Sequence, residues 1–357
     1  MRKVISIVGA RPQFIKAATL SRQFRLLGVQ ESIIHTGQHF EANMSDIFFR
    51  EMEIPKPAYQ LDIHTLSHGA MTGRMIEGIE KALQVEKPDG VVLYGDTNST
   101  LAGALAASKL RIPIVHVEAG LRSFDMTMPE EVNRVLTDRV SSILFCPTET
   151  AANNLKREGF DHLPARIVNS GDVMYDAALY YEDKAQLKSD ILRRIGGTKK
   201  YVLATIHREE NADSPEKLRS IIAGLNEIHK QVPVVVPLHP RTRNILAQQY
   251  ILPNFMIIDP VGYFDMIMLL KNAELVITDS GGVQKEAFFF GKHCITLREQ
   301  TEWVELVEKG FNVLVGSDSR RLISAFNSFS VQESDFSANL YGNGHAAKTM
   351  AEIIQKF

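Results

Sequence analysis

Acidic side chains interrupt or follow short apolar runs in the first half of the 357-residue sequence. Glu118 lies within PIVHVEAG (113–120). A carboxylate is costly to bury there unless it is paired or used, so the pattern favours a functional role for Glu118. Asp96 follows GVVLY (90–94). Because Asp also favours the position that caps a helix, Asp96 fits a capping role as well as a catalytic one.

A pair of glutamates opens the next amphipathic stretch, PEEVNRVLTD (129–138). The proline predicts the first turn of a helix, and the two carboxylates suit the positive end of the helix dipole. Arg134 and Asp138 follow Glu131 at one and two helical turns, so these three side chains share one face. The same spacing is typical of a solvated row of ion pairs, and both interpretations stay open on these residues alone.

Histidines stand at two expected strand ends in the second half of the chain. His207 lies in TIHREEN (205–211), and His239 lies in PLHPRT (237–242). A histidine at such a place can donate a hydrogen bond to a phosphate or act as an acid. A surface or core histidine without a function is the alternative, and the pattern itself does not separate the two.

The most specific local pattern is VITDSGGVQKEA (276–287), in which an expected strand turns through Ser280, Gly281 and Gly282 directly into a helix. Such a turn presents bare backbone N–H groups and the positive end of a helix to an anion, and the serine adds a hydroxyl donor. Glu286 lies one turn into the helix, where a carboxylate can accept two ribose hydroxyls. The pattern predicts an anion site, with an ordinary tight turn and an exposed glutamate as the alternative.

The first turn of the chain begins like a dinucleotide-binding turn and then departs from it. In IVGARPQFIK (7–16), Arg11 and Pro12 stand where a second and third glycine are expected. The GxGxxG fingerprint with its later ribose-binding acid is absent, and so is a Walker sequence. We therefore expect no nicotinamide or ATP cofactor and no metal, and expect Arg11 and Lys16 to present basic groups to a ligand.

Short runs rich in Val and Ile alternate with longer amphipathic stretches from end to end, which predicts α/β structure with mostly parallel sheets. A polar, charged stretch at about 175–200 interrupts the series. We expect a Rossmann-like domain over 1–175, a second over 196–343, and a closing helix over 344–357. Ligands of such sheets bind beyond the carboxyl ends of the strands, so a cleft between the two domains is the expected site.

Composition narrows the classes of partner. Apolar residues make up 45% of the chain and charged residues 23%, and the formal net charge is −2. These values are ordinary for a soluble globular protein and do not favour nucleic acid or a membrane surface as a partner. Cys146 and Cys294 lie in apolar runs, so we expect buried thiols in a reducing compartment. Without an apparent signal peptide or an apolar run of about 18 residues, a cytoplasmic protein is the expectation.

Seven motifs, taken together and in order, resemble the non-hydrolysing UDP-N-acetylglucosamine 2-epimerases: GARPQFIK, YGDTNST, HVEAGLRS, PEEVNR, TIHREEN, GY at 262–263 and TDSGGVQKEA. The resemblance covers nearly the whole chain. It implies a GT-B glycosyltransferase-like architecture with two Rossmann-like domains, a UDP-sugar substrate in the cleft between them, and a homodimer. It also implies that the second domain binds UDP and that the helix at 344–357 packs back on the first domain.

The chemistry of that family gives the carboxylates a purpose. The C2 proton of the sugar is not next to a carbonyl, so family members are thought to eliminate UDP from C1 while a base removes the C2 proton. The resulting glycal is reprotonated on the other face and recaptured by UDP. This route needs acid and base groups around C2 and an anion clamp for UDP, but no nicotinamide.

The resemblance also carries roles to particular residues. The catalytic acids of the family match Asp96, Glu118 and Glu131, and the histidine that supports the departing pyrophosphate matches His207. Its substrate contacts match Arg11, Lys16 and Arg134 in the first half, and in the second half Ser280, Gly281 and Gly282 for the pyrophosphate, Glu286 for the ribose, and Gly262 with Tyr263 for the uracil.

Two segments depart from the pattern of many UDP-N-acetylglucosamine epimerases. SFDMTM (123–128) is shorter than the usual segment, and TGQHF (36–40) replaces a TAQHR-type segment. The shorter loop is more similar to members that epimerise UDP-2,3-diacetamido-2,3-dideoxyglucuronic acid, whose extra carboxylate Arg122 could receive. Either substrate therefore fits the sequence, and a second, regulatory nucleotide-sugar site is left open. The alternatives outside this class are a hydrolysing 2-epimerase, a GT-B glycosyltransferase and a non-catalytic sensor.

Overall fold

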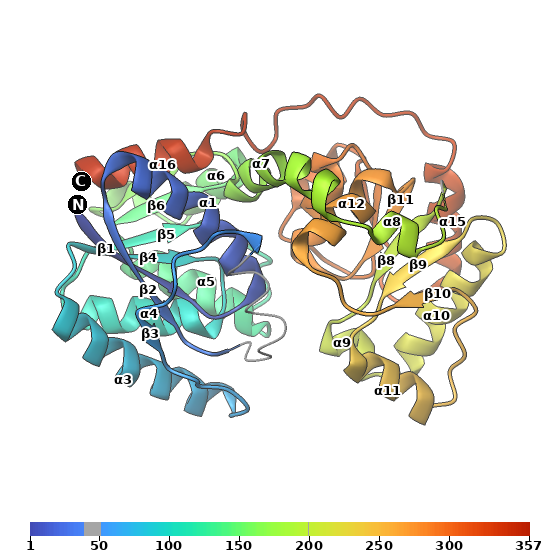
Figure 1. Cartoon of the computed structure of the whole chain (residues 1–357), viewed down its shortest axis with the longest axis horizontal. Helices are drawn as coiled ribbons and strands as arrows, with labels where there is room; N and C mark the ends of the chain where they lie inside the picture. Colours follow the sequence, from blue (N-terminus) through green and yellow to red (C-terminus); the bar gives the residue numbers. More distant parts are fainter. Residues whose placement is uncertain (39–50, 199) are drawn as a thin grey trace. The chain divides into compact units, whose positions relative to one another are not determined.

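The structure is a computed structural model that describes residues 1–38, 51–198 and 200–357 (Figure 1). The chain divides into two compact units. The first unit contains Met1–Ala177 and Asn339–Phe357, and the second contains Ala178–Ala338. Each unit is built on one parallel sheet with helices packed against it, which confirms the α/β class that the alternating pattern predicts.

The sheet of the first unit has seven parallel strands among the described residues, in the order β3-β2-β1-β4-β5-β6-β7. Isoleucine and valine fill the strand interiors, as expected for strands covered on both faces. The strands are β1 (Lys3–Val8), β2 (Gln30–His35), β3 (Tyr59–Gln60), β4 (Gly90–Tyr94), β5 (Ile114–Val117), β6 (Ile143–Cys146) and β7 (Arg166–Asn169).

Helices connect these strands and cover the sheet. They are α1 (Arg11–Leu27), α3 (His68–Glu86), α4 (Asn98–Lys109), α5 (Pro129–Val140), α6 (Glu149–Arg157), the short η1 (Phe160–His162) and α16 (Ala346–Lys356). On one face, Ile79 and Ala102 from α3 and α4 join Ile7 and Leu93 in a common core cluster. Helix α16 returns from the C-terminus to lie beside α1 (Figure 1).

Helix α7 (Val173–Lys188) crosses from the first unit into the second. The stretch that reads as a linker in the sequence is therefore largely helical, and it continues into α8 (Ile191–Arg194). Tyr181 and Ala185 are four residues apart and fully buried. Tyr181 packs its ring edge-on against Tyr263 in the second unit, so its segment belongs to that unit's core.

The second unit has a six-stranded parallel sheet among the described residues, in the order β10-β9-β8-β11-β12-β13. Its strands are β8 (Val202–Thr205), β9 (Val234–Pro237), β10 (Met256–Ile258), β11 (Leu275–Thr278), β12 (Cys294–Thr296) and β13 (Asn312–Leu314). Its remaining helices are α9 (Glu209–Ala212), α10 (Pro215–His229), α11 (Pro240–Gln248), α12 (Tyr263–Asn272), α13 (Gly281–Phe289), α14 (Val304–Glu308) and α15 (Ser319–Phe329).

In both sheets the order of the strands reverses at one point, called the switch point. In the first unit β1 lies between β2 and β4, and in the second β8 lies between β9 and β11. Loops that leave neighbouring strands in opposite directions open a crevice at such a point. The topology therefore places the turns after β1 and β4 together in the first unit, and the turns after β8 and β11 together in the second.

Candidate active site

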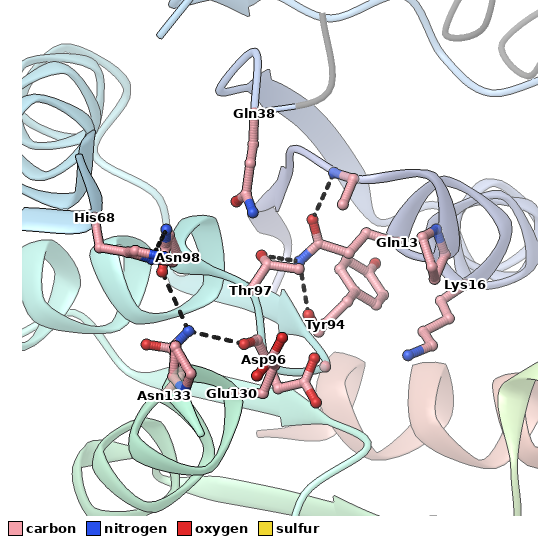
Figure 2. A pocket seen from close by; sticks show the side chains of 14 residues that line it. Gln13, Lys16, Gln38, His68, Tyr94, Asp96, Thr97, Asn98, Glu130 and Asn133 are labelled. Atoms are coloured by element: carbon pink, nitrogen blue, oxygen red, sulfur yellow. Dashed lines mark hydrogen bonds between the residues drawn. The ribbon is translucent and has the colours of Figure 1, made fainter. Parts of the chain in front are cut away.

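A cavity of about 230 Å³ opens at the switch point of the first sheet (Figure 2). Five segments form its wall: the start of α1, the segment after β2, the turn from β4 into α4, and the starts of α3 and α5. The lining residues are Ala10, Pro12, Gln13, Lys16, Gln38, His68, Tyr94, Gly95, Asp96, Thr97, Asn98, Pro129, Glu130 and Asn133.

Gln13 ties the first turn to the turn after β4. Its Oε1 accepts the backbone N–H groups of Gly9 and Ala10 at 2.8 and 3.0 Å, and its Nε2 donates to the Tyr94 carbonyl at 2.7 Å. Gly9 has no space for a Cβ, because the hydroxyls of Ser99 and Thr36 occupy that position. The backbone donors that a glycine-rich turn offers to a phosphate are used within the protein here. Sequence reasoning missed Gln13, although a buried glutamine one turn into α1 signals such a link.

Lys16 and Glu118 form an ion pair beside Gly95. Both side chains are at least nine-tenths buried. Glu118 adopts a left-handed backbone with φ of 74°, which is unusual for a residue other than glycine and typical of functional sites. The Glu118 and Ala119 N–H groups both donate to the Phe145 carbonyl, at 3.1 and 2.9 Å, and hold the backbone in this shape. The structure thus brings together two residues that the sequence singles out in distant segments.

Arg134 links Asp96 to Glu131. Its Nη2 lies 2.6 Å from Asp96 Oδ2, and its Nη1 lies 2.8 Å from Glu131 Oε2. Asp96 lines the cavity with a partly exposed carboxylate, as the catalytic interpretation requires. Arg134 is buried and orients that carboxylate, so it acts on Asp96 in addition to any contact with substrate.

Glu131, which the family resemblance marks as catalytic, is engaged by groups of the protein. Its side chain is only 1% exposed and is absent from the cavity wall. The carboxylate accepts the Ser123 N–H at 2.9 Å and the Phe124 N–H at 3.0 Å, besides the guanidinium of Arg134. Two donors from the loop at 123–128 and one from α5 therefore hold Glu131, and its catalytic role stays a prediction.

Glu130, which sequence reasoning treated as a dipole partner, lines the cavity. In Figure 2 its carboxylate lies in the same part of the cavity as Asp96. The two glutamates of PEE therefore have different surroundings, because successive residues of a helix point about 100° apart. The sequence shows a pair of glutamates at this place. Which of the two faces the cavity depends on where α5 begins, and it begins at Pro129.

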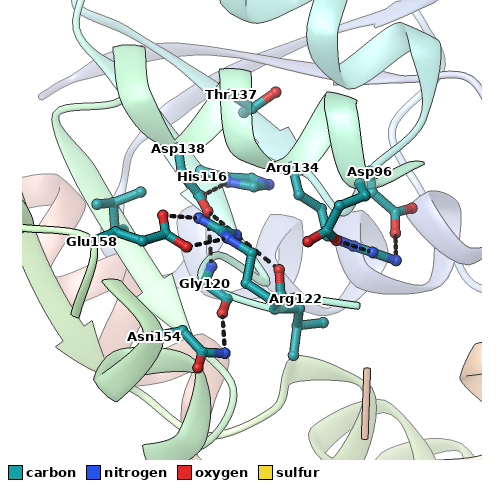
Figure 3. A network of polar contacts seen from close by, with 12 residues as sticks. Asp96, His116, Gly120, Arg122, Arg134, Thr137, Asp138, Asn154 and Glu158 are labelled. Atoms are coloured by element: carbon teal, nitrogen blue, oxygen red, sulfur yellow. Dashed lines mark hydrogen bonds and ion pairs between the residues drawn. The ribbon is translucent and has the colours of Figure 1, made fainter. Parts of the chain in front are cut away.

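Arg122, expected to receive a substrate carboxylate, is engaged by groups of the protein (Figure 3). Arg122 is 2% exposed and lies outside the cavity wall. Its Nε and Nη2 donate to Glu158 at 2.7 and 2.8 Å, and its Nη1 donates to Asp138 Oδ2 and to the Leu121 carbonyl, each at 2.8 Å. All three guanidinium nitrogens thus have partners within the protein, and a contact with a substrate carboxylate stays a prediction.

The sequence also singles out Arg11 and the TGQHF segment in the first unit. Arg11 is the first residue of α1 and is partly buried, but it is not among the residues that line the cavity. In TGQHF, Gln38 reaches the cavity and accepts the Ser99 N–H and hydroxyl at 3.2 and 2.8 Å. His39 and Phe40 lie outside the described residues.

In the second unit, Asp279 at the end of β11 holds His207 at the end of β8. The Asp279 carboxylate lies 2.9 Å from His207 Nδ1 and also accepts the backbone N–H groups of His207 and Arg208. Burial alone would raise the pKa of Asp279, but its hydrogen bonds and the charge of His207 lower the pKa overall. The His207 side chain is 54% exposed, so its other ring nitrogen is available to a ligand. Sequence reasoning did not assign this orienting role to Asp279.

The glycine turn forms as the sequence predicts. Ser280 is the N-cap of α13, its side chain makes no capping hydrogen bond, and Gly281 and Gly282 open the helix. A Cβ built on Gly282 would meet nothing within 4 Å, so its backbone is open to a ligand. Glu286 is buried in the second turn of the same helix.

The uracil platform expected at Gly262 and Tyr263 is only partly available. Gly262 is the N-cap of α12, and its backbone is partly exposed. The Tyr263 side chain is 3% exposed and packs against Tyr181, with ring centroids 6.0 Å apart. A buried ring cannot stack on a base, so any base contact here falls to the backbone at the start of α12.

Over residues 1–38, 51–198 and 200–357, no group of three or more His, Cys, Asp or Glu residues could hold a metal ion. No helix within these ranges is long and apolar enough to cross a membrane. Cys146 and Cys294 are buried free thiols.

Comparison with known proteins gives a consistent result. The sequence profile of a family described as UDP-N-acetylglucosamine 2-epimerase matches residues 25–355. A Pseudomonas aeruginosa UDP-2,3-diacetamido-2,3-dideoxy-D-glucuronate 2-epimerase is 54% identical over 356 residues, 99% of each chain. A Methanocaldococcus jannaschii UDP-N-acetylglucosamine 2-epimerase is 44% identical over 99% of this chain and 98% of its own. The crystal structure of that enzyme from the same organism with UDP-N-acetylglucosamine and UDP matches with a TM-score of 0.93, covering 99% of this chain and 100% of its own.

Proposed function

The chain belongs to the UDP-N-acetylglucosamine 2-epimerase family, an assignment that confirms the resemblance read from its motifs, and we propose UDP-2,3-diacetamido-2,3-dideoxy-D-glucuronate as its substrate. Its reaction is epimerisation at C2 of a UDP-sugar, and its architecture is of the GT-B type. The observation that carries the choice of sugar is the 54% identity, over 99% of both chains, to an enzyme named for that substrate.

UDP-N-acetylglucosamine is the second candidate. It is the sugar named for the M. jannaschii relatives, which are 44% identical. The two substrates differ at C3 and C6. The diacetamido-glucuronate carries a second acetamido group at C3, where UDP-N-acetylglucosamine has a hydroxyl, and it carries a carboxylate at C6. The cavity wall contains amide side chains and the cation of Lys16, which suit acetamido groups and an anion.

We assign proton transfer at C2 to Asp96 and Glu130. Inversion needs a proton removed from one face of C2 and returned to the other, so two groups serve better than one. Both carboxylates line the same cavity, and they come from different elements, the turn after β4 and the start of α5. Arg134 fixes the geometry of Asp96. The ion pair of Lys16 and Glu118 adds a cation and a third carboxylate beside Gly95.

The proposed route is elimination followed by re-addition. One carboxylate takes the C2 proton, the C1–O bond breaks, and its electron pair leaves with UDP while a C1=C2 double bond forms. The glycal then accepts a proton on the opposite face of C2, and UDP re-forms the bond to C1. Atoms and electrons balance without any redox cofactor.

We assign the diphosphate to the second unit. The backbone at Gly282 is open, whereas Glu302 lies against Gly281. The open backbone and the positive end of α13 can stabilise an anion, and His207 can donate to the leaving oxygen. Glu286 on the same helix remains our candidate for the ribose hydroxyls. A homodimer and a cytoplasmic location also remain predictions, and light scattering of the purified chain tests the first of them.

The test of the substrate assignment is a comparison of kcat/KM for the two UDP-sugars with the same purified enzyme. We expect turnover of the diacetamido-glucuronate at least about 100-fold more efficient, because a site built for polar groups discriminates strongly against a substrate that lacks them. A preference for UDP-N-acetylglucosamine would overturn the assignment in favour of the second candidate. Release of free sugar with UDP would place the chain among hydrolysing epimerases.

A further inference from the structure

His116 lies, fully buried, where the segments that carry three carboxylates meet (Figure 3). It belongs to β5, which ends next to Glu118. Its Nδ1 is 2.6 Å from Asp138 Oδ1 on α5, the helix whose first turn carries Glu130. Its Nε2 is 2.7 Å from the carbonyl oxygen of Gly95, the residue before Asp96.

Both neighbours of the ring accept hydrogen bonds and donate none. A carbonyl oxygen carries no hydrogen, and neither does an ionised carboxylate, whereas neutral imidazole has only one N–H. We propose that His116 is held as a protonated imidazolium and is a positioning residue for the epimerisation, joining the segments of Asp96, Glu118 and Glu130. The inference rests on the roles proposed above for Asp96 and Glu130.

The shared proton belongs on His116 and not on Asp138. Asp138 Oδ2 accepts the Gly120 N–H at 3.1 Å and the guanidinium of Arg122 at 2.8 Å, and both interactions favour an ionised carboxylate. Burial alone would raise the pKa of Asp138, but the charges and hydrogen bonds of His116 and Arg122 lower that pKa overall. A proton moved to Asp138 would forfeit these interactions.

Charge balance leads to the same conclusion. Asp138 and Glu158 carry two negative charges, and Arg122 carries one positive charge. The nearby thiol of Cys146 stays neutral, since burial raises its pKa. A charged His116 therefore makes the network neutral overall, although only Asp138 of the two carboxylates is fully buried and the Glu158 side chain is 31% exposed.

The imidazolium can position groups without contacting substrate. It fixes the Gly95 carbonyl, and with it the left-handed turn (φ 63°) that directs Asp96 into the cavity. Through Asp138 it fixes α5, and through its own strand it fixes the approach to Glu118. A small displacement of reacting groups costs up to about 100-fold in rate. Loss of the hydrogen bonds of His116 should therefore slow the chemical step more than it weakens substrate binding.

The decisive experiment is 15N-detected or 15N-correlated NMR of the imidazole nitrogens in the full-length protein, with His116 assigned through its bonded neighbours in β5. We expect both ring nitrogens to carry hydrogen at neutral pH, because each lies within hydrogen-bond distance of an acceptor. One bare nitrogen at neutral pH would overturn the inference. This result does not depend on the substrate, so it is separate from the success of the proposed function.

Kinetics of His116→Gln test the positioning role. Glutamine keeps much of the volume but cannot donate in two opposite directions, so we expect kcat to fall at least about 10-fold while KM changes less than about 3-fold. His229→Gln, in α10 of the second unit, is the control and should leave both constants unchanged. An unchanged kcat in a folded His116→Gln enzyme would overturn the role. If that variant fails to fold, His116→Asn is measured in the same way, with the same outcomes.

Discussion

Glu130 and Glu131 show how two identical side chains at adjacent positions take different functions. Glu130 faces the cavity, and Glu131 accepts two hydrogen bonds from the loop at 123–128 and one from Arg134. Residues of a helix change direction at every step, so the register of α5 places only the first of the two carboxylates at the cavity, and we propose that this one takes part in the chemistry.

This difference predicts opposite effects of the same substitution. Glu130→Gln should lower kcat by about 100-fold or more, because an amide cannot exchange the C2 proton, and should change the free energy of unfolding by less than about 0.5 kcal/mol. Glu131→Gln should lower the free energy of unfolding by about 2 kcal/mol, because it weakens charge-assisted hydrogen bonds in a buried place. Steady-state kinetics and urea unfolding of both variants provide the measurement. Near-normal turnover by Glu130→Gln would remove Glu130 from the mechanism.

Glu31 predicts a pH dependence of stability that has nothing to do with catalysis. Burial raises the pKa of Glu31 from its ordinary value of 4.5 to about 7, although hydrogen bonds from Ser21 and Ser6 and the charge of Arg25 oppose the rise. The folded protein then holds a proton that the unfolded chain releases. The contribution of this bound proton to the free energy of unfolding is complete below pH 4.5. It is lost as the pH rises from 4.5 to about 7, and it stays lost above that.

Urea unfolding across this range, compared between the natural chain and Glu31→Gln, checks the sign. We expect the variant to gain stability relative to the natural chain as the pH rises, because glutamine carries no proton to lose. Parallel stability curves for the two proteins between pH 4.5 and 7 would show that Glu31 does not titrate as its burial requires.

At the scale of elements, the alternating pattern of the sequence predicted the strands better than it predicted the segments that connect them. Strands made of continuous Val and Ile runs, such as β4 and β9, are recognisable because both faces of a parallel sheet are buried. The short edge strands β3 and β7 lack such runs, since each pairs on one side only. The polar segment that reads as a linker is mostly helix, because two buried positions at Tyr181 and Ala185 suffice to anchor it.

The same contrast holds for the candidate site. Strand ends identified Asp96, Glu118, His207 and the glycine turn, because ligands of parallel sheets bind at that edge. The sequence could not show that Arg122, Glu131 and Tyr263 are buried, because their burial depends on partners such as Glu158, Ser123 and Tyr181 from other segments. Gln13 and Asp279 were missed for the same reason.

The start of α13 makes a prediction that separates ligand binding from folding. Gly282 lies inside the helix with open space around its Cβ position. Gly282→Ala should raise the free energy of unfolding by up to about 1 kcal/mol, because alanine favours helix. The same methyl group should weaken UDP binding several-fold if the bare backbone faces the diphosphate. Isothermal titration with UDP measures this effect, and unchanged affinity would remove the turn from the diphosphate site.

At the scale of the whole molecule, we propose that one reaction uses groups of both units. The first unit contains the carboxylates of the cavity, and the second contains the glycine turn and the His207–Asp279 pair. Elimination of UDP calls for both contributions, since proton removal at C2 gains nothing unless the leaving group at C1 is stabilised as it departs.

The most direct test of the central claim is proton NMR of the reaction in D2O with UDP-2,3-diacetamido-2,3-dideoxy-D-glucuronate. The account predicts the UDP-linked manno epimer with deuterium at C2, because the proton lost to a carboxylate of the cavity is replaced from solvent. An epimer that keeps its original C2 proton without exchange, or folded enzyme that binds UDP and produces no epimer from either UDP-sugar, would contradict it.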